Sequence, residues 1–383
     1  MTKLFRLSVI KRTAIVITLF LLSFNSFAIT TLSDIGARSY LLIDFNSNNI
    51  LASKDPTKQI EPASITKLMT AYVIYKELAA GKVDMRDLVL ISEKAWRKKG
   101  SRMFVEANKK VPLERLMSGL IIQSGNDAAI ALAEHVAGTE ENFVKRMNSE
   151  AELLGMKNTK FSNTTGWPDK GNHYSTAEDI AILARAIISE FPEHYKLYKQ
   201  KEYSYNGIKQ YNRNKLLWLD PSVDGMKTGH TGSAGYCLVS SAERSRMRLI
   251  AVLIGAKSAK ERSDYSQQLM EFGYRNYETN KLYKAGAVLE KVRVWKGNKK
   301  VVPIGLLEDY YITVPKGILA NLEGSIEFIS DADAPIQRGD AMGKLIIKEG
   351  DKVIIEHPVV ALTDVAGGGI WRKVTDGIQK VFH

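Results

Sequence analysis

Cysteine is nearly absent from this sequence: its 383 residues include only Cys237, so no disulfide bond can form within the chain. Histidine is scarce as well, with 6 residues, and neither an HExxH pair nor a His/Cys ligand spacing occurs. We therefore expect neither a metal site nor a cofactor. The remaining composition, 45% hydrophobic and 25% charged, excludes a disordered or collagen-like chain, and the length favours two domains.

The first 28 residues have the pattern of a secretory signal. Four basic residues and no acidic one accompany a short apolar run, Ala14–Leu22, and Ser26-Phe27-Ala28 is a small-x-small cleavage site. The apolar run is too short to span a bilayer comfortably, so we expect cleavage after Ala28 rather than an uncleaved anchor. No cysteine follows the cleavage site, which excludes a lipoprotein.

A net charge of +12 would suit nucleic acid, an anionic membrane or an acidic substrate. Cleavage of the signal removes four positive charges from +12 and leaves +8 on the mature chain. Export argues against a DNA or RNA partner, and a secreted chain with one cysteine suits a bacterial periplasm. We therefore expect a periplasmic protein that binds no nucleic acid.

Strand and helix signals interleave over residues 29–278, which form the first predicted domain. The predicted strands cover 39–44, 50–53, 226–230, 236–242 and 247–254. The predicted helices cover 64–80, 112–122, 126–136 and 176–188. The third of these helices is apolar on nearly every side, which is typical of a helix inside a large core. This order of elements indicates an α+β fold, or a three-layer sandwich, with an antiparallel sheet flanked by helices.

Residues 282–365 alternate apolar and polar side chains with a period of two between turns, which predicts a second, all-β domain. Residues 366–383 begin with a run of glycines and continue as an amphipathic helix with basic side chains opposite its apolar face. That apolar face consists of Ile370, Trp371, Val374, Ile378, Val381 and Phe382. The helix is too short to span a bilayer, so it either lies on an anionic membrane surface or docks on its own protein. The glycines and the terminal position favour the membrane.

Three short motifs carry residues that are capable of chemistry. In Ser64-Ile65-Thr66-Lys67 the serine and lysine are one helical turn apart, on the same face. A serine hydroxyl becomes a nucleophile when a base removes its proton, and a lysine of lowered pKa can be that base. Taken alone, Ser64 could equally be a helix N-cap.

The other two motifs are ambiguous in the same way when each is considered alone. Ser124-Gly125-Asn126 opens the apolar helix, where polar side chains must face a cavity or find partners, although a simple cap is the alternative. Lys227-Thr228-Gly229 lies on a predicted strand, where a lysine is usually solvated. Its glycine permits close approach of another backbone or a ligand.

Together and in this order, the three motifs are the signature of serine β-lactamases and penicillin-binding proteins, and the chain resembles that superfamily. More narrowly, it resembles the low-molecular-mass D-alanyl-D-alanine carboxypeptidases of the penicillin-binding protein 5 type. This narrower resemblance rests on the glycine in Ser124-Gly125-Asn126, and on the segments 173–176, 212–214 and 223–231. It extends to the β domain and the tail. The resemblance implies a serine β-lactamase-like catalytic domain in front of the β domain.

The resemblance also implies a role for each motif residue. Ser64 would attack the penultimate D-alanine of a peptidoglycan stem peptide, Lys67 would accept its proton, and Ser124 would protonate the departing D-alanine. Asn126 would hold the substrate amide, and the backbone N–H groups of Ser64 and His230 would form the oxyanion hole. The substrate carboxylate would be held by Lys227 and Thr228 beside Gly229, with Arg248 as a weaker candidate, and Lys227 would lower the pKa of Lys67 by charge repulsion.

Three functional readings remain open at this point. In a carboxypeptidase, penicillin would be a covalent inhibitor, and the protein would attach to the outer face of the inner membrane through its tail. A class A-like β-lactamase would need a loop glutamate for deacylation, and the loop 162–174 has only one acidic residue, Asp169. A non-catalytic peptidoglycan-binding scaffold would have no need to retain Ser64, Lys67, Ser124 and Lys227.

Overall fold

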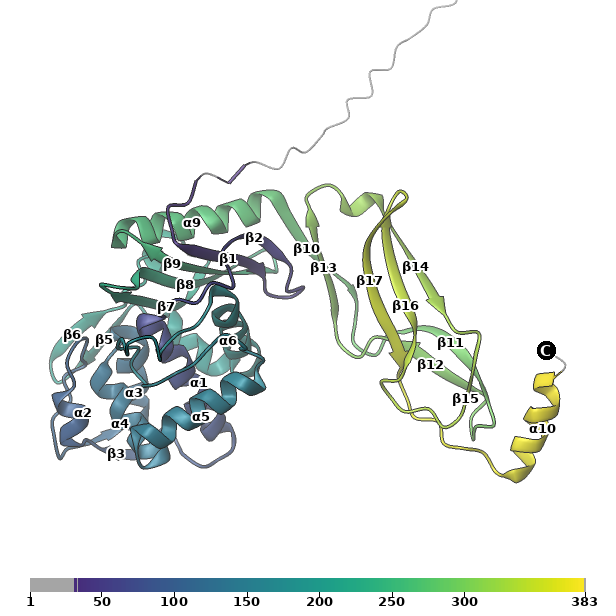
Figure 1. Ribbon diagram of the computed structural model, residues 1–383, viewed down its shortest axis with the longest axis horizontal. Helices are drawn as coiled ribbons and strands as arrows, with labels where there is room; N and C mark the ends of the chain where they lie inside the picture. The colour runs from purple at the N-terminus through teal and green to yellow at the C-terminus, as the bar shows by residue number, and fades with distance from the viewer. Residues whose placement is uncertain (1–30, 33, 382–383) are drawn as a thin grey trace, which may run out of the picture.

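The computed structural model describes residues 31–32 and 34–381, and Figure 1 shows them as two domains followed by a C-terminal helix. The predicted secretory signal and its cleavage site lie outside the described residues, as does Phe382.

An antiparallel sheet of five strands forms the centre of the first domain. Its strand order is β2 (Ile50–Lys54), β1 (Ser39–Asp44), β9 (Met247–Ala256), β8 (Gly235–Arg244) and β7 (Val223–Thr231). The predicted strands are therefore confirmed, and the short turns 232–234 and 245–246 join the last three as consecutive hairpins.

Apolar side chains on alternate residues supply both faces of this sheet, because successive side chains of a strand point to opposite sides. Leu42, Leu249 and Leu253 pack with α9 (Ala259–Asn276) in one core cluster. Leu41 and Ile250 belong to the larger cluster on the other face, with the remaining helices. Figure 1 shows the three layers, with α9 on one side of the sheet and the other helices on the opposite side.

The larger helical layer is built around α1 (Lys67–Ala79), α4 (Asn126–Ala137) and α6 (Ala177–Glu190). The prediction of a core helix is confirmed for α4, whose residues are buried from Asn126 through Ala133. The side-chain oxygen of Thr176 caps α6 by accepting the N–H of Asp179. The smaller elements are η1 (Ala63–Thr66), β3 (Leu88–Leu90), α2 (Glu93–Arg97), β4 (Lys110–Pro112), α5 (Glu140–Leu153), α7 (Pro192–Tyr195), η3 (Lys196–Lys199), β5 (Glu202–Tyr205), β6 (Ile208–Tyr211) and α8 (Leu216–Leu219).

The helix predicted over 112–122 is interrupted. It consists of α3 (Leu113–Ser118), followed by a π-helical turn, η2 (Gly119–Gln123). Ser124 then adopts the left-handed conformation with φ of 65°. Such conformations are uncommon for residues other than glycine, and they cluster at functional sites.

The second domain is all-β, as predicted. Its main sheet has the order β14-β16-β17-β12-β11-β15, and β10 pairs with β13 in a smaller sheet. Its strands are β10 (Tyr277–Tyr283), β11 (Val288–Trp295), β12 (Val301–Gly305), β13 (Tyr310–Pro315), β14 (Leu322–Phe328), β15 (Asp331–Asp333), β16 (Ala341–Glu349) and β17 (Lys352–Ala361), and η4 (Leu319–Asn321) is a short helix. Because β10 pairs with β13, this domain begins at Tyr277 and not at the predicted residue 282.

A buried carboxylate joins the two domains. Asp44, at the end of β1, accepts hydrogen bonds from the Ser47 backbone at 2.7 Å and from the Thr279 hydroxyl of β10 at 2.7 Å. The hydroxyl of Thr313 in β13 lies 2.6 Å from the Ser47 hydroxyl and 2.8 Å from that of Thr279. This network connects the tip of the β1–β2 hairpin to the second domain.

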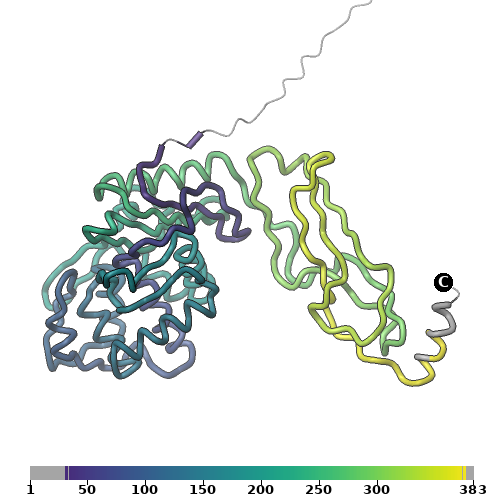
Figure 2. Tube along the Cα trace, in the orientation of Figure 1, coloured from purple at the N-terminus to yellow at the C-terminus, as the bar shows by residue number. Residues whose placement is uncertain are grey.

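The tail forms α10 (Ile370–Val381), at the end of the second domain far from the first, as Figure 2 shows. Its polar face contacts the β11–β12 turn, where the buried side chain of Asp376 accepts the Lys296 N–H at 2.6 Å and pairs with Arg372 at 3.0 Å. Three apolar side chains near its start are exposed, Ile370 by 81%, Trp371 by 84% and Val374 by 50%. Within the described residues, no helix combines the length and the apolar character needed to cross a bilayer.

Candidate active site

The first motif lies where η1 meets α1, so that Ser64 and Lys67 share one turn. The Lys67 ammonium is 3.1 Å from the Ser64 hydroxyl oxygen, as their spacing predicts. Ala63, immediately before the serine, has a φ of 47°, a left-handed conformation that is uncommon for alanine. The nucleophile candidate is therefore presented on a constrained turn.

Lys67 is buried, with 1% of its surface exposed, and is completely surrounded by hydrogen-bond partners. Its Nζ donates to the Asn126 side-chain oxygen and to the Thr165 carbonyl, both at 2.7 Å. Burial, followed by the positive charge of Arg213, lowers the pKa of Lys67 to about 7. The predicted effect of Lys227 on Lys67 does not appear among the causes of this shift; the effect runs the other way, since burial and then Lys67 lower the pKa of Lys227 well below its usual value.

The second motif brings Ser124 and Asn126 to the same site. Ser124 is buried, and its hydroxyl has no hydrogen-bond partner among the described residues, so it is free to accept or deliver a proton. Asn126 contacts Lys67 through its oxygen and donates through its nitrogen to the Lys99 carbonyl at 2.7 Å. The next residue, Asp127, accepts the backbone N–H groups of Met103 and Phe104, at 3.0 and 2.9 Å, and so holds the segment that precedes them against the motif.

The loop 162–174 forms the wall behind Lys67. The Asn163 side-chain oxygen accepts the N–H groups of Gly166 and Trp167, at 2.8 and 3.1 Å, and closes a tight turn. Gly166 has a φ of 83°, and a Cβ atom placed on it would lie 1.7 Å from the Ala63 carbonyl oxygen. Only glycine therefore allows the loop to pack on the turn that carries Ser64.

His173 connects the end of this loop to the first motif. Its Nδ1 accepts the Ser162 N–H at 3.0 Å, and its Nε2 therefore carries the proton toward the Thr66 hydroxyl at 2.7 Å. Burial lowers the pKa of His173 to about 4, so the ring is neutral at pH 7 and has a structural role.

The third motif lies on β7, which packs along η1. A Cβ atom on Gly229 would lie 3.1 Å from the Pro62 carbonyl oxygen and 3.2 Å from Ala63 Cβ, so glycine allows the close approach that the sequence predicted. Lys227 is buried and donates to the Thr228 carbonyl at 3.1 Å. The centroid of the exposed His230 ring lies 4.0 Å from the ring centroid of Tyr236 on β8.

The motifs border a cleft of about 450 Å³. Its lining consists of Ser64, Ser101, Ser124, Asn212, Arg213, Lys215, Thr228, Gly229, His230, Tyr236 and Arg262. Among the described residues, neither Arg213 nor Arg262 has an acidic partner, and Arg262 donates to the Arg213 carbonyl at 3.2 Å. The cleft therefore has a serine hydroxyl next to a lysine on one side and unpaired cations on another.

Arg248, the weaker candidate for the substrate carboxylate, does not line this cleft. Its guanidinium pairs with Asp224 at 2.8 Å and with Glu243 at 2.6 Å. Arg248 lies opposite Glu243 in the β8–β9 register, at the end of these strands remote from Tyr236, which lines the cleft. Tyr195 also donates to Asp224, at 2.7 Å, so the arginine completes a half-buried structural network.

Arg213 and Arg262 are the cleft residues that the sequence did not reveal as site candidates. Arg213 lies inside the segment Asn212-Arg213-Asn214, which was recognised as part of the resemblance but given no role. Arg262 lies on α9, outside every motif, and only the packing of α9 beside β8 brings it to the cleft.

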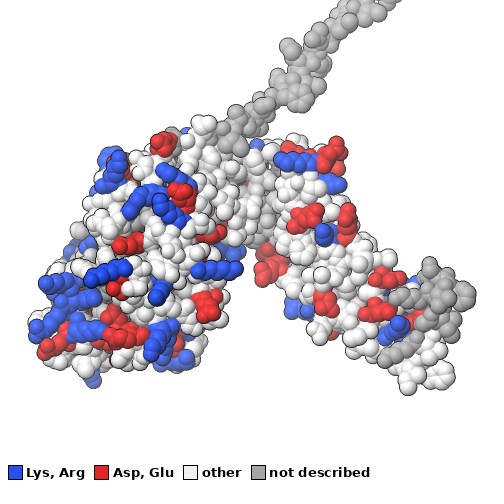
Figure 3. Space-filling view, in the orientation of Figure 1, with Lys and Arg blue, Asp and Glu red and all other residues white. Residues whose placement is uncertain are grey.

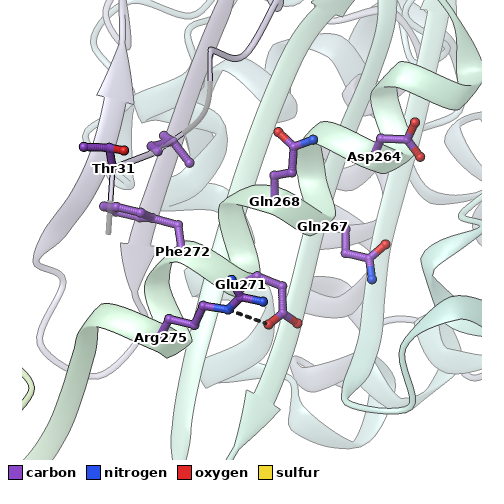
Figure 4. Close-up of a pocket in the computed structure, with 8 residues that line it drawn as sticks. Thr31, Asp264, Gln267, Gln268, Glu271, Phe272 and Arg275 are labelled. Carbon is purple, nitrogen blue, oxygen red and sulfur yellow. Dashed lines mark ion pairs between the residues drawn. The ribbon is translucent and has the colours of Figure 1, made fainter. Parts of the chain in front are cut away.

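Another pocket, of about 370 Å³, lies along the outer side of α9. Figure 4 shows it bordered by Thr31, Gln268 and Phe272, with an ion pair between Glu271 and Arg275. None of the motif residues lines it. Over the residues that the structure describes, no three His, Cys, Asp or Glu side chains group as metal ligands.

A serine paired with a buried lysine of lowered pKa, on this sheet and helix arrangement, defines an active-site serine enzyme of the penicillin-binding protein class. The comparisons with known proteins identify the family. Residues 26–258 match the D-alanyl-D-alanine carboxypeptidase family, and residues 277–366 match the C-terminal domain of penicillin-binding protein 5. The chain belongs to the D-alanyl-D-alanine carboxypeptidase family and is a serine peptidase.

Relatives and solved structures agree with this assignment over nearly the whole chain. D-alanyl-D-alanine carboxypeptidase DacA of Escherichia coli K12 is 40% identical over 357 residues, which covers 91% of this chain and 88% of the relative. DacA of Haemophilus influenzae is 42% identical, covering 89% and 88%. The crystal structure of penicillin-binding protein 5 from Haemophilus influenzae has a TM-score of 0.84 at 41% identity, covering 88% of this chain and 99% of that one. These matches support the peptidase reading over the β-lactamase and scaffold alternatives.

Proposed function

We propose that the chain removes the terminal D-alanine from peptidoglycan stem peptides through an acyl-enzyme on Ser64. The observation that carries this proposal is the 3.1 Å contact between the Ser64 hydroxyl and Lys67, whose pKa of about 7 leaves much of it neutral at pH 7. Neutral Lys67 takes the hydroxyl proton while Ser64 Oγ bonds to the carbonyl carbon of the penultimate D-alanine.

Collapse of the tetrahedral intermediate breaks the peptide bond. Lys67 passes the proton it took from Ser64 to Ser124, whose own hydroxyl proton goes to the departing amine, so that Lys67 is neutral again. The Ser124 hydroxyl suits this relay because it is buried and has no other partner among the described residues. The backbone N–H groups of Ser64 and His230 hold the oxyanion. Water then attacks the Ser64 ester while neutral Lys67 takes one of its protons. When the ester bond breaks, Lys67 returns this proton to Ser64 Oγ, which releases the shortened peptide and restores the serine hydroxyl.

The terminal carboxylate of the substrate lies at the cationic end of the cleft. Thr228 and Lys227 hold it from β7, and Arg213 and Arg262 take the part that the sequence assigned to Arg248. Unpaired guanidinium groups suit this part because they donate to a carboxylate in a planar, paired geometry. Asn126 holds the amide on the other side of the scissile bond.

Penicillin, which also has a carboxylate beside its reactive amide, acylates Ser64 and is released slowly. Slow release is expected because the loop behind Lys67 has no glutamate, and Asp169 is exposed. The nearby Glu140 is engaged, since it accepts the Thr164 hydroxyl at 2.9 Å and pairs with Lys94 at 3.2 Å.

Intact-protein mass spectrometry after penicillin treatment tests the acylation step. We expect one stable adduct on wild type, located by peptide mapping to Ser64, and none on Ser64→Ala. Rapid turnover of penicillin without release of D-alanine from a D-Ala-D-Ala peptide would contradict the proposal and favour a β-lactamase.

We also propose that α10 attaches the protein to the outer face of the inner membrane, with the catalytic domain in the periplasm. The helix docks on its own domain through its polar face, whereas Ile370 and Trp371 remain exposed. Exposed Trp and aliphatic side chains on a short amphipathic helix suit insertion into the headgroup region of a bilayer.

Cell fractionation tests this attachment. Deletion of residues 366–383 should move the protein from the membrane to the soluble periplasmic fraction. The double variant Trp371→Glu/Val374→Glu should do the same, because both side chains are exposed on the apolar face. Retention of the deletion variant on membranes would show that α10 is not the anchor.

A further inference from the structure

A third pocket, of about 430 Å³, lies beside the active-site cleft and contains none of the motif residues. It is lined by one aromatic side chain and four cations, namely Trp167, Lys94, Arg97, Lys98 and Lys99. Figure 3 shows Lys and Arg side chains gathered over the part of the first domain where Figure 1 places α2, the helix that precedes Lys98.

Only a narrow backbone segment separates this pocket from the reacting groups. A Cβ atom on Gly100 would lie 2.6 Å from the Asn126 side-chain nitrogen and 3.2 Å from the Trp167 ring. Asn126 donates to the Lys99 carbonyl, and Ser101 lines the active-site cleft itself. A chain that leaves the cleft past Asn126 therefore meets Trp167 and the two lysines next.

Trp167 is held at a defined position relative to Ser64. Its N–H is bound by Asn163, and the preceding Gly166 packs on the Ala63 carbonyl next to the nucleophile. Its ring is nevertheless half-exposed, at 50%, and a large aromatic surface held in this way is suited to contact a ligand. The same turn thus positions the ring and, through Thr165, the general base Lys67.

The cations divide into paired and unpaired groups. Lys94 pairs with Glu140 and Glu141, and Arg97 pairs with Glu93. Lys98 and Lys99, in contrast, have no ion pair within the part of the chain that the structure describes. Two unpaired ammonium groups next to a fixed aromatic ring favour an anionic ligand with some apolar surface.

We propose that this pocket binds the part of the stem peptide upstream of the D-alanyl-D-alanine end, with its free carboxylates on Lys98 and Lys99 and its aliphatic surface on Trp167. The inference rests on the proposed function, which places the terminal carboxylate at Arg213 and Arg262 and so directs the upstream chain past Asn126. It adds a distal subsite that discriminates between substrates by the charge they carry away from the scissile bond.

The test compares two substrates that share the same D-Ala-D-Ala end. One is a pentapeptide muropeptide with free upstream carboxylates, and the other is the same muropeptide with those carboxylates amidated. The measured quantity is the ratio of kcat/KM for the two substrates, with D-alanine release as the readout and the full chain as the enzyme. Penicillin titration of each variant counts the folded active sites independently.

Wild type should have the higher kcat/KM for the substrate with free carboxylates. In Lys98→Gln/Lys99→Gln the ratio of the two kcat/KM values should fall about tenfold, because each of the two exposed charge pairs contributes about threefold. The ratio should fall with salt in wild type but not in the double variant. Lys157→Gln, an exposed lysine of the same domain outside both pockets, should keep the wild-type ratio. Trp167→Ala should raise KM for both substrates by several-fold, with a smaller effect on kcat.

An unchanged ratio in the double variant, with full penicillin titration, would overturn the subsite. An unchanged KM in Trp167→Ala would overturn the role of the ring. Absence of D-alanine release from both substrates by wild type would instead refute the proposed function, and the inference with it.

Discussion

The rate at which penicillin acylates this enzyme should follow the protonation state of Lys67. Burial and the charge of Arg213 lower the lysine pKa from 10.5 to about 7. This fall corresponds to about 5 kcal/mol of relative destabilisation of the charged form. At pH 7 about half of Lys67 is then neutral, whereas a lysine of ordinary pKa would be neutral in only about one molecule in three thousand.

Because the neutral amine is the base, acylation is lost as pH falls and reaches a plateau as pH rises. The first-order rate at saturating penicillin should be about a hundredfold lower at pH 5 than at pH 9, with a midpoint near 7. Arg213→Gln removes a charge that lowers the Lys67 pKa, so its midpoint should move to higher pH. Stopped-flow acylation over pH 5–10 measures both, with Lys157→Gln as the matched control. A flat profile, or a midpoint that Arg213→Gln leaves in place, would refute Lys67 as the base.

Three further variants test how the site is held together. Gly166→Ala places a methyl group 1.7 Å from the Ala63 carbonyl oxygen at a φ of 83°. The variant should therefore lower the acylation rate at least tenfold, measured by penicillin kinetics, and lower the free energy of unfolding by roughly 2 kcal/mol or more, measured in urea. Arg248→Met leaves Asp224 without its ion-pair partner and should destabilise the protein by about 2–4 kcal/mol, while folded molecules keep their acylation rate. If the variant instead lost affinity only for ligands that carry a carboxylate, Arg248 would belong to the substrate site. Thr313→Val removes two hydroxyl contacts from the domain junction and should cost about 1–2 kcal/mol in unfolding experiments without changing D-alanine release; an unaltered free energy of unfolding would show that the junction network contributes little.

Local patterns were sufficient to predict most of the fold. The alternation that produces Leu41 and Leu42 on opposite faces of β1 is visible in the sequence, as is the apolar helix α4. The short turns between β7, β8 and β9 make their antiparallel pairing nearly unavoidable. The first strand of the second domain was missed because Tyr277–Tyr283 has few fully apolar residues and becomes a strand only by pairing with β13.

Some residues of the candidate site could be predicted from local sequence, and others reach it only through long-range packing. Ser64 and Lys67 are one turn apart, so their contact follows from helical geometry alone. Arg262 reaches the cleft only through the packing of α9, and no local pattern distinguishes it from a surface arginine. The sequence could not place Arg248 relative to the cleft, since a strand direction alone does not say which end of the strand borders the cleft. The pairing of Arg248 with Glu243 in the β8–β9 register places Arg248 at the end of the strand remote from the cleft.

The π-helical turn before Ser124 is a further feature that periodicity does not predict. It inserts an extra residue into the helix and turns Ser124 into the left-handed conformation, which leaves its hydroxyl buried and without a partner among the described residues. The turn also packs closely on a distant segment, since a Cβ atom on Gly119 would lie 2.3 Å from the Met103 sulfur. Long-range contacts of this kind are absent from any local reading of the sequence.

The most direct test of the whole account is D-alanine release from a pentapeptide muropeptide, followed by mass spectrometry of the product. We predict that wild type yields the tetrapeptide and one equivalent of D-alanine, and that Ser64→Ala, folded as judged by its circular dichroism and urea midpoint, yields neither. Equal release by wild type and Ser64→Ala would contradict the assignment of Ser64 as the nucleophile of a D-alanyl-D-alanine carboxypeptidase.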